Sequence, residues 1–591
     1  MLWMLLAVLS VNSDLLYAEE ATFNELRYEL NENRLTAEVA SNPKVSGEIV
    51  IPAEIRVGQN TYTVTSIGDK AFKGCKNLTS VVLPATLQRV YRSAFEGTGF
   101  MLDKNNWQEG CLWIDSVLIA TDKNIKPRFI LPANTRIIAA GAFADNKAVT
   151  RVELPATLKR IDHETFRNCK NLTKVIIPAS VTSIGEEAFT GSGIYLNENK
   201  WKKGALIIDD CLVATNNDLP AKYIFKNSTP IRLIAERAFA ERKQLKTVII
   251  PATITRIPTA AFFHCENLTD VTIPAEVTEV DNFAFYDCAL LKNALLPKGL
   301  QHLGMGAFYG CINLREQVLG EQIEILEQAT FYMCRSLKKM PLPAHLRKIE
   351  NGVFAGCASL EEIHLPETLE SLGETAFAGC ITLRDLIIPA KVGSVSKELC
   401  IGCTHLNRVV LPEGLYAVGN EAFKDCIELE KVNIPKTTYR IGEYAFANCT
   451  QMRRINLVPH IHKLEQGAFM GCKMLEQVTI PEQLEVIEKE AFANCLNLYE
   501  VTFGDANSAL KTIEAGAFFH CVALREITFN PTLQTIGDEA FAECRNLRKI
   551  TYPEALKQIG AGAFRDCANL RQPMFAPHVS VGKNAYKGTK K

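Results

Sequence analysis

Residues 166–189 read FRNCKNLTKVIIPASVTSIGEEAF, and this stretch holds one full copy of the pattern that decides the fold. A Cys lies three residues after the first Phe, a Leu six residues after it, and aliphatic residues nine and eleven after it. Pro178 then ends the alternating segment, because proline has no N–H to donate to a strand ladder. The second half carries Ile184-Gly185 and closes on Ala188-Phe189, where the pattern begins again.

The same pattern recurs along nearly the whole chain. Most steps from one Phe slot to the next are 23 residues long, and Cys400 fills one of the slots. Four steps differ: 48 residues after Phe95, 50 after Phe189, 26 after Phe492 and 22 after Phe564. The Leu-x-x-Val-x-Ile spacing alternates between inside and outside, as a short strand requires. A unit of this length matches a leucine-rich repeat of roughly 20–29 residues, and such units bury their apolar faces only by stacking.

We therefore expect a repeat solenoid over residues 66–591, built from 23-residue leucine-rich repeats. A parallel β-sheet is expected on the concave face, with mostly irregular or short helical return segments. Residues 19–65 lack the 23-residue pattern but alternate in short segments such as residues 26–30. We expect them to form a β-rich N-terminal cap over the open edge of the first coil.

Residues 2–9 form an apolar run that is too short to span a bilayer. We interpret residues 1–18 as a signal peptide with cleavage after Ala18, and expect a secreted or cell-surface protein. Two features are unusual for a signal peptide: neither Lys nor Arg precedes the run, and Leu16 is larger than the residue usual at that place. The sequence shows no later membrane-spanning segment.

The composition is that of a folded protein, with 47% hydrophobic and 22% charged residues and a formal net charge of -1. This balance gives no electrostatic argument for binding nucleic acid or an anionic membrane surface.

Phrases such as VTSIGEEAF at residues 181–189 resemble the BspA-type leucine-rich-repeat family, which is abundant in gut and oral Bacteroidetes. The resemblance covers roughly residues 45–587. It implies a surface or secreted protein, since known members include proteins that bind matrix proteins such as fibronectin and fibrinogen and promote adhesion. The family has no catalytic residues to carry over, so the resemblance implies no enzyme.

The 19 cysteines raise the possibility of disulfides or metal sites, but sixteen of them occupy the slot three residues after the Phe. A free Cys in such a packing slot behaves as a small hydrophobe. Neighbouring ladder cysteines would lie about 4.8 Å apart, within disulfide range, yet their side chains project in parallel. We expect buried, reduced thiols. Cys400 and Cys403 form the single C-x-x-C, a redox motif elsewhere; because Cys400 fills a Phe slot, we interpret the spacing as coincidence.

No catalytic or metal-binding constellation is found in the sequence. His460 and His462 lie in one coil without a Cys, an Asp or a third His nearby, so we expect surface histidines. There is no G-x-S-x-G, no HExxH and no phosphate-binding Gly loop. We therefore expect no enzyme, no metal and no cofactor.

Both long steps contain the same kind of insertion, near residues 97–138 and 191–234. Each carries two β-rich runs around Asp-Ser or Asp-Asp, which predicts a hairpin. Trp107 and Trp201 occupy matching positions in the two inserts. Each Trp is a candidate for contact with a partner from a protruding lip. The favoured alternative is that each Trp covers its own hairpin.

The outward positions of the predicted strands are those eight and ten residues after the Phe. Arg408, Lys431 and Arg454 share the first of these positions and predict a basic stripe that could face an acidic partner. The alternative is a solvated face with cross-strand pairs such as Lys339 with Glu362, worth only tenths of a kcal/mol each.

The sequence thus favours a protein that binds other macromolecules, host or matrix proteins above all, in adhesion. The alternative is a surface glycan-binding protein of a nutrient-uptake system, whose mark would be exposed aromatic side chains on one face. An enzyme would need a non-repeat domain, for which the periodicity leaves no room.

Overall fold

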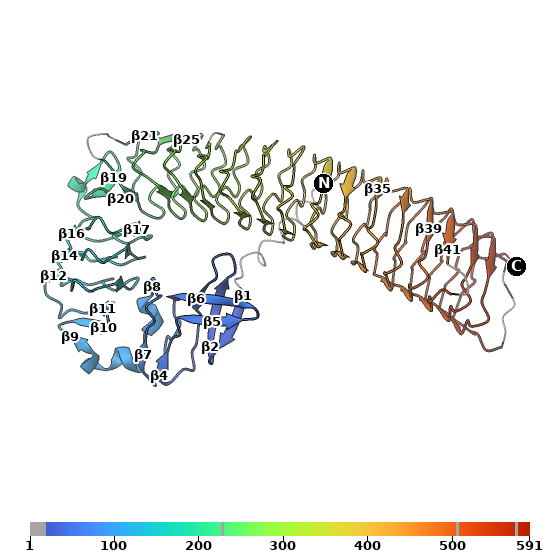
Figure 1. The fold of residues 1–591 in the computed structure, drawn as a ribbon, viewed down its shortest axis with the longest axis horizontal. Coiled ribbons are helices and arrows are strands. Elements are labelled where there is room, and N and C mark those ends of the chain that lie inside the picture. Colours follow the sequence, from blue (N-terminus) through green and yellow to red (C-terminus); the bar gives the residue numbers. More distant parts are fainter. Residues whose placement is uncertain are drawn as a thin grey trace. The chain divides into compact units, whose positions relative to one another are not determined.

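The computed structural model describes residues 19–225, 230–292, 294–503, 507–571, 573 and 577–590. The segment interpreted as a signal peptide lies outside the described residues. The chain divides into two compact units, which we call the N-terminal unit (residues 19–265) and the C-terminal unit (residues 266–590). Both contain stacked coils of about 23 residues with parallel strand pairing and almost no helix (Figure 1), which confirms the predicted fold class.

Successive coils are joined at the Phe slot by backbone hydrogen bonds. The N–H of Phe446 donates to the carbonyl of Ala468 at 2.9 Å, and the N–H of Phe469 donates to that of Ala491 at 2.8 Å. The two Phe rings are fully buried and stacked, with centroids 5.5 Å apart. Burial of each such ring contributes about 1.5–3 kcal/mol, so the Phe ladder is a main source of the stability of both units.

The Cys three residues after the Phe fills the interior and also donates a weak hydrogen bond. The Sγ of Cys472 lies 3.3 Å from the carbonyl oxygen of Phe446, 26 residues earlier, and Cys265 makes the same contact with Phe239 at 2.9 Å. A thiol serves here as a small apolar group with one weak donor. All nineteen cysteines are buried and free, including Cys400 and Cys403.

We expect the native protein to react hardly at all with Ellman's reagent at neutral pH, and nineteen thiols to react after unfolding in guanidinium chloride. The reactive species is the thiolate, and burial raises the pKa of Cys169 and Cys265 to about 12. The rate of thiol release measured against the rate of unfolding checks this. Fast reaction of several thiols in the folded chain would contradict a buried ladder.

A tight turn after the Phe determines which residue types recur two positions after it. The residue two positions after the Phe has a positive φ in many coils, for example 57° at Asn168 and 71° at Gly310. This left-handed conformation is costly for most residues but tolerated by Gly and by Asn. The recurrence of Gly, Asn and Asp in this slot follows.

Many coils of the N-terminal unit carry a second short strand besides the one that the sequence predicts. Three of the predicted strands lie eight to ten residues after the Phe slot: β14 (Arg151–Glu153), β16 (Lys174–Ile176) and β23 (Thr247–Ile249). Two strands that follow the inserts continue the same row, β12 (Arg128–Ile130) beside β14 and β21 (Lys222–Ile224) beside β23. The additional strands have two residues each: β8 (Arg89–Val90), β13 (Ile137–Ile138), β15 (Arg160–Ile161), β17 (Ser183–Ile184), β22 (Leu233–Ile234) and β24 (Arg256–Ile257). Within this curved unit, β12, β14 and β16 lie on the outer side and β8 and β17 on the inner side (Figure 1). The concave side of this unit is therefore formed by the two-residue strands, and the prediction that the Leu-x-x-Val-x-Ile strands form the concave face is wrong for this unit.

Residues 19–67 form a sheet of their own at the start of the N-terminal unit. Its order is β1-β2-β3-β6-β5, with the strands β1 (Glu19–Phe23), β2 (Leu26–Asn31), β3 (Thr36–Val39), β5 (Glu54–Val57) and β6 (Asn60–Ile67). One face of this sheet buries Tyr28 and Tyr62 completely. Since β6 also pairs in parallel with β8, the sheet continues into the inner strands. On the outer side, β4 (Gly47–Val50) pairs with β7 (Leu78–Val82).

The two inserts have matching structures. The first contains a short helix α2 (Gly99–Leu102), a 3-10 turn η3 (Lys104–Asn106) and the strands β9 (Trp107–Gln108), β10 (Cys111–Ile114) and β11 (Val117–Thr121), after the 3-10 turn η2 (Arg92–Phe95). The second contains η4 (Glu198–Lys200), β18 (Trp201–Lys202), β19 (Ala205–Ile208) and β20 (Cys211–Thr215). In each insert the two longer strands form an antiparallel hairpin, with a register shift at the same place.

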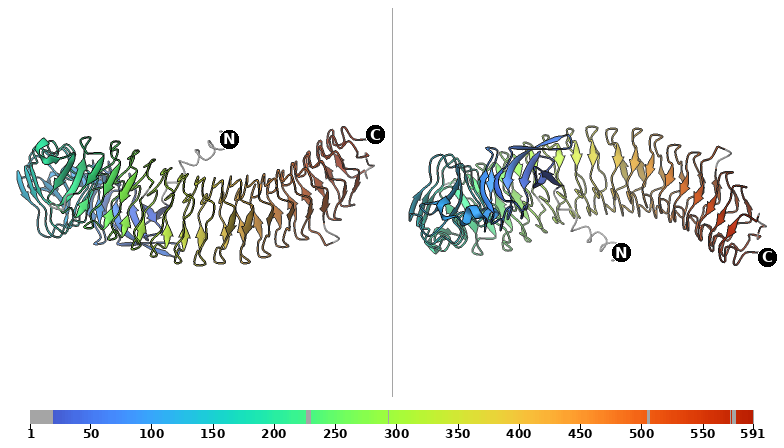
Figure 2. Two further views of the ribbon diagram at one scale, coloured as in Figure 1. Left: turned by 90° about the horizontal axis from the view of Figure 1, so that it is seen from above. Right: turned by 90° about the horizontal axis from the view of Figure 1, so that it is seen from below.

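The C-terminal unit has the same two kinds of strand, and both views of Figure 2 show its coils side by side. Six of the predicted strands form one parallel sheet: β31 (Asp385–Ile387), β33 (Arg408–Val410), β35 (Lys431–Val432), β37 (Arg454–Ile455), β39 (Gln477–Thr479) and β41 (Glu500–Thr502). Three more are β25 (Asp270–Thr272) and the pair β43 (Glu526–Thr528) and β45 (Lys549–Thr551).

The two-residue strands of the C-terminal unit run in the same chain order. They are β26 (Glu279–Val280), β27 (His302–Leu303), β28 (Ile325–Leu326), β29 (Lys348–Ile349), β30 (Ser371–Leu372), β32 (Ser394–Val395), β34 (Ala417–Val418), β36 (Arg440–Ile441), β38 (Lys463–Leu464), β40 (Val486–Ile487), β42 (Thr512–Ile513), β44 (Thr535–Ile536), β46 (Gln558–Ile559) and β47 (Ser580–Val581).

Candidate interaction surfaces

The three cations of the predicted basic stripe lie on neighbouring strands. Arg408 on β33 pairs in register with Lys431 on β35, which pairs with Arg454 on β37. All three side chains are exposed. Because the sheet continues through β31 and β39, the stripe is held on a rigid face rather than on a loop.

Carboxylates neutralise the positive charges of this stripe only in part. The Nη1 atom of Arg408 lies 4.0 Å from a carboxylate oxygen of Asp385 on the adjoining strand. No carboxylate within residues 294–503 lies at ion-pair distance from Lys431 or Arg454. By contrast, Lys339 pairs with Glu362 at 2.8 Å, as the solvated-face interpretation expects elsewhere in the same row. The stripe therefore carries a local positive charge.

An apolar pair lies beside the stripe. Ile387 and Val410 are in register on β31 and β33, and both are exposed. On the next strands the same position holds the polar residues Asn433 and Asn456. The face thus combines cations with two exposed aliphatic side chains.

The two insert tryptophans are fixed by their own inserts. The indole N–H of Trp107 donates to the carbonyl of Met101 at 2.9 Å, and that of Trp201 donates to the carbonyl of Tyr195 at 2.8 Å. Both side chains are half-buried, and Trp201 packs edge-on against Tyr195. These contacts agree with the interpretation that each Trp covers its own hairpin. A contact of either ring with a partner stays a prediction.

An exposed aromatic pair lies on the other strand row. Tyr416 precedes β34 and Tyr439 precedes β36, and their rings are nearly parallel with centroids 5.9 Å apart. They are 46% and 55% exposed. The sequence did not predict this pair, because neither tyrosine lies at a position eight or ten residues after the Phe slot.

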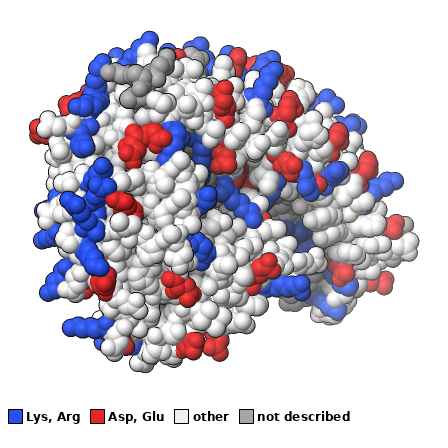
Figure 3. All heavy atoms as spheres, turned by 60° about the vertical axis from the view of Figure 1, so that its left-hand side comes forward, with Lys and Arg blue, Asp and Glu red and all other residues white. Residues whose placement is uncertain are grey.

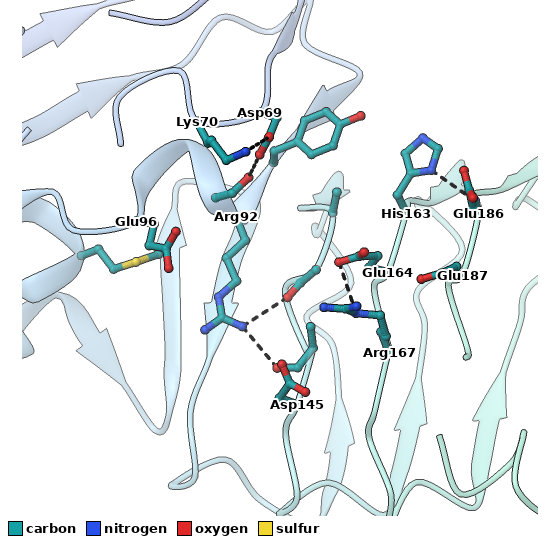
Figure 4. Close-up of a pocket in the computed structure, with 16 residues that line it drawn as sticks. Asp69, Lys70, Arg92, Glu96, Asp145, His163, Glu164, Arg167, Glu186 and Glu187 are labelled. Carbon is teal, nitrogen blue, oxygen red and sulfur yellow. Dashed lines mark hydrogen bonds and ion pairs between the residues drawn. The ribbon is translucent and has the colours of Figure 1, made fainter. Parts of the chain in front are cut away.

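The N-terminal unit contains a hollow of about 830 Å³ beside its inner strands (Figure 4). Its wall has six carboxylates and three cations. The cations are held by close partners: Lys70 by Asp69 at 3.0 Å, Arg167 by Glu164 at 3.3 Å, and Arg92 by two backbone carbonyls. Two of the carboxylates also pair with cations just outside the wall, Glu96 with Lys73 at 2.7 Å and Glu186 with Arg237 at 2.9 Å, so the hollow keeps only a small excess of negative charge.

Buried charges lie behind one wall of this hollow. Asp162 is 2% exposed, and its Oδ2 atom is 3.1 Å from Nε of Arg89 and 3.3 Å from Nε of Arg160. A second guanidinium nitrogen of Arg160 lies 2.7 Å from the buried carboxylate of Glu236. The Nδ1 atom of His163 accepts the N–H of Glu186, which leaves Nε2 facing Asp162 at 3.7 Å and Glu236 at 3.5 Å. We call Arg89, Arg160, Asp162, His163 and Glu236 the ion-pair cluster.

The electrostatics of the ion-pair cluster are dominated by its carboxylates. Burial is the largest single effect on Arg89 and lowers its pKa, but Asp162, Glu236 and the other negative groups around it together outweigh burial, and the net pKa is raised. Burial also raises the pKa of Tyr91, whose ring stacks on His163 with centroids 6.2 Å apart. The cluster is thus a charged, paired arrangement rather than a set of neutralised groups.

The ion-pair cluster bridges over intervening coils. Arg89 reaches Asp162, 73 residues away, and Arg160 reaches Glu236, 76 residues away. Small residues such as Ala139 and Gly185 occupy the corresponding positions of the coils between them. A Cβ on Gly185 would lie 2.5 Å from the backbone nitrogen of His163, so no larger residue fits there. No single stretch of sequence contains both partners, which is why sequence analysis missed the cluster.

The predicted surface histidines are exposed: His460 and His462 both point away from the core. Across the part of the chain that the structure describes, no group of three His, Cys, Asp or Glu side chains is arranged to hold a metal ion. In the same part, no helix has the length and apolar composition needed to cross a bilayer.

The coil geometry and the repeated Leu, Phe and Cys slots define the class of protein: a leucine-rich-repeat solenoid. The model of the BspA type leucine rich repeat region matches residues 57–127, 119–214, 222–338, 324–453, 393–509 and 505–591. The chain therefore belongs to the BspA-type leucine-rich-repeat family. No curated protein matches the sequence.

Several solved structures are similar to the chain. A leucine-rich repeat protein from Bacteroides ovatus is 20% identical, with 93% of this chain and 92% of that chain covered and a TM-score of 0.23. A leucine rich cell surface protein from Faecalibacterium prausnitzii is 18% identical, with 90% and 94% covered and a TM-score of 0.28. The pneumococcal vaccine antigen PcpA is 15% identical, with 91% and 95% covered and a TM-score of 0.26. We draw no functional argument from these likenesses.

Proposed function

We propose that this protein is secreted or displayed at the cell surface, where it binds other proteins in adhesion. Membership of the BspA-type family supports this proposal, because such repeat proteins are typically surface proteins involved in protein interaction. The family is a repeat family and not a catalytic one, so we propose binding rather than catalysis.

The single observation that carries the proposal is the basic stripe of Arg408, Lys431 and Arg454. Three exposed cations in register on a rigid sheet attract an acidic surface and orient it along the solenoid. Ile387 and Val410 add apolar area next to the charges, which a protein partner can cover. The partner expected from this chemistry is an acidic segment of a host or matrix protein.

The test is binding of the purified chain to an array of matrix proteins and glycans. We expect binding to acidic proteins that weakens with added salt. Reversing all three stripe cations, as Arg408→Glu, Lys431→Glu and Arg454→Glu, should weaken it by tenfold or more, which is about 1.4 kcal/mol.

A matched pair of single variants distinguishes the effect of losing a stripe cation from the effect of changing the net charge. Lys431→Glu should weaken binding, while Lys549→Glu, an exposed lysine in the same slot on β45, should leave it unchanged. Equal effects of the two variants, or none from the triple variant, would remove the stripe from the proposal.

Glycan binding is a second candidate function, favoured by the exposed pair Tyr416 and Tyr439. Aromatic rings at a protein surface offer apolar faces against which sugar rings can pack. Retention on the glycans of the same array, and on none of its proteins, would favour this candidate over protein binding.

A further inference from the structure

We infer that the outer face of the N-terminal unit binds an anionic lipid surface. The inference goes beyond the proposed function, which concerns a protein partner and the C-terminal unit. It rests on a second row of cations, on exposed aliphatic side chains beside them, and on the separation of charge across the N-terminal unit.

The second row of cations lies on β12, β14 and β16. Arg128 is in register with Arg151, and Arg151 with Lys174. Arg151 is paired with Glu153 on its own strand at 2.7 Å. Arg128 and Lys174 are exposed, and no carboxylate within residues 19–225 lies at ion-pair distance from either. On β21, Lys222 occupies the same outward position.

Aliphatic side chains stand beside these cations. Ile130 follows Arg128 by two residues on the same face of β12 and is 68% exposed, and Ile224 stands in the same relation to Lys222 and is 51% exposed. The two inserts add Leu102, which is 62% exposed at the end of α2, and Leu196, its 59% exposed counterpart. Exposure of this extent at four related places is costly in water unless a partner covers the side chains.

Charge is divided between the two sides of the N-terminal unit. The hollow beside the inner strands has a small excess of carboxylates, most of them ion-paired, whereas the strands on the outer side carry the exposed cations Arg128 and Lys174. Figure 3, in which the left-hand side of Figure 1 comes forward, shows several Lys and Arg side chains at the left margin of that face, with Asp and Glu side chains among them. The net charge of -1 sums over all 591 residues, so it does not report the local positive charge that an anionic surface would meet at these strands.

The chemistry of the face fits a lipid surface better than a protein. Protein interfaces centre on aromatic or Arg anchors that fill pockets, whereas these aliphatic side chains stand singly, each close to a cation or on an insert. At a bilayer surface a Lys or Arg reaches the phosphate level while a neighbouring Leu or Ile enters the acyl boundary. A fluid bilayer also adapts to separated side chains, which a rigid partner would have to match in position.

Co-sedimentation with vesicles tests the inference. We expect the full chain to bind vesicles of phosphatidylcholine mixed with phosphatidylglycerol and to leave vesicles of phosphatidylcholine alone in the supernatant. The double variant Arg128→Glu and Lys174→Glu should lower partition onto the mixed vesicles by about tenfold or more. The variant Ile130→Asn and Ile224→Asn should also lower it, while the remaining binding stays sensitive to salt.

The control changes net charge equally in the C-terminal unit: Lys549→Glu and Lys557→Glu, both exposed lysines, should bind the vesicles as the unaltered chain does. An unaltered tryptophan-fluorescence unfolding midpoint shows that the variants of the N-terminal unit are folded, and an unaltered far-UV circular dichroism midpoint shows the same for the control in the C-terminal unit. Absence of binding to the mixed vesicles, or equal binding by the Arg128 and Lys174 variant, would overturn the inference. Capture by immobilised polyglutamate without binding to vesicles would also overturn it, in favour of an acidic protein partner.

Discussion

Replacing Asp162 by Asn is expected to destabilise the N-terminal unit by about 3 kcal/mol. The carboxylate is 2% exposed and is the shared partner of Arg89 at 3.1 Å and of Arg160 at 3.3 Å. Both guanidinium groups are less than a third exposed, so water replaces little of the lost interaction. An amide of the same shape keeps the packing and removes the charge, which leaves two cations close together without their shared counter-charge.

Tryptophan fluorescence during urea unfolding measures the change in the free energy of unfolding of the N-terminal unit. The three tryptophans among the described residues, Trp107, Trp113 and Trp201, all lie in the N-terminal unit, so their fluorescence reports that unit. Asp145→Asn provides the control, because Asp145 is an exposed carboxylate of the hollow that accepts one hydrogen bond, from Asn168. We expect that control to change stability by less than about 0.5 kcal/mol. A loss no larger for Asp162→Asn than for Asp145→Asn would show that the ion-pair cluster is not stabilising.

The repeat period made several features predictable from sequence alone. In a parallel solenoid with a constant step, residues that share a slot become neighbours on adjoining strands. This is why the register of Arg408, Lys431 and Arg454, and the burial of the Phe and Cys ladders, followed from counting. Whether the stripe contacts a partner does not follow from register, because exposure and contact are different properties.

Features that depend on departures from the period could not be predicted. The ion-pair cluster joins residues 73 and 76 positions apart across the coils that hold the inserts. The two-residue strands such as β15 and β17 are too short for an alternating pattern to be recognised. The environment of Trp107 and Trp201 depends on a turn within each insert, where carbonyls of Met101 and Tyr195 accept the indole N–H. None of these follows from slot counting.

Net charge does not describe how charge is distributed, because it sums over the whole chain. A net charge of -1 gave no argument for an anionic surface. The structure places the exposed cations Arg128 and Lys174 on the outer strands of the N-terminal unit, and such a local arrangement does not appear in a sum over all residues. Arg151 and Lys174 are one 23-residue repeat apart, so comparing equivalent repeat positions in the N-terminal unit would have identified this pair of cations.

The second large effect is expected at Leu399 and Cys400, where one coil departs from the Ala-Phe pattern. Neighbouring coils place Ala376-Phe377 and Ala422-Phe423 in these slots, and all of these side chains are fully buried. The small and the large residue have exchanged places, so Leu399 fills space that a ring fills elsewhere. The main-chain links are unchanged, since Phe377 N–H donates to Leu399 at 2.9 Å and Cys400 N–H to Ala422 at 2.8 Å.

Each single reversion should therefore destabilise the C-terminal unit, and the double reversion should restore much of the loss. Leu399→Ala leaves a cavity and should cost about 2–5 kcal/mol, and Cys400→Phe overpacks the core and should cost about 1–3 kcal/mol. In the double variant the ring occupies the space that the leucine vacated and continues the Phe stack from Phe377 to Phe423. We expect a coupling free energy of about 1–3 kcal/mol in favour of the double variant.

Far-UV circular dichroism during guanidinium unfolding, with hydrogen exchange at the Phe-slot amides, measures the cycle in the C-terminal unit. Tryptophan fluorescence serves as the internal control, because this unit contains no tryptophan and the fluorescence midpoint should stay constant. If the destabilisation of the double variant equals the sum of the two single-variant values within about 0.5 kcal/mol, the two side chains do not share one space. The exchange of sizes would then be accidental, and the coil at Cys400 would have to be stabilised by contacts other than complementary packing.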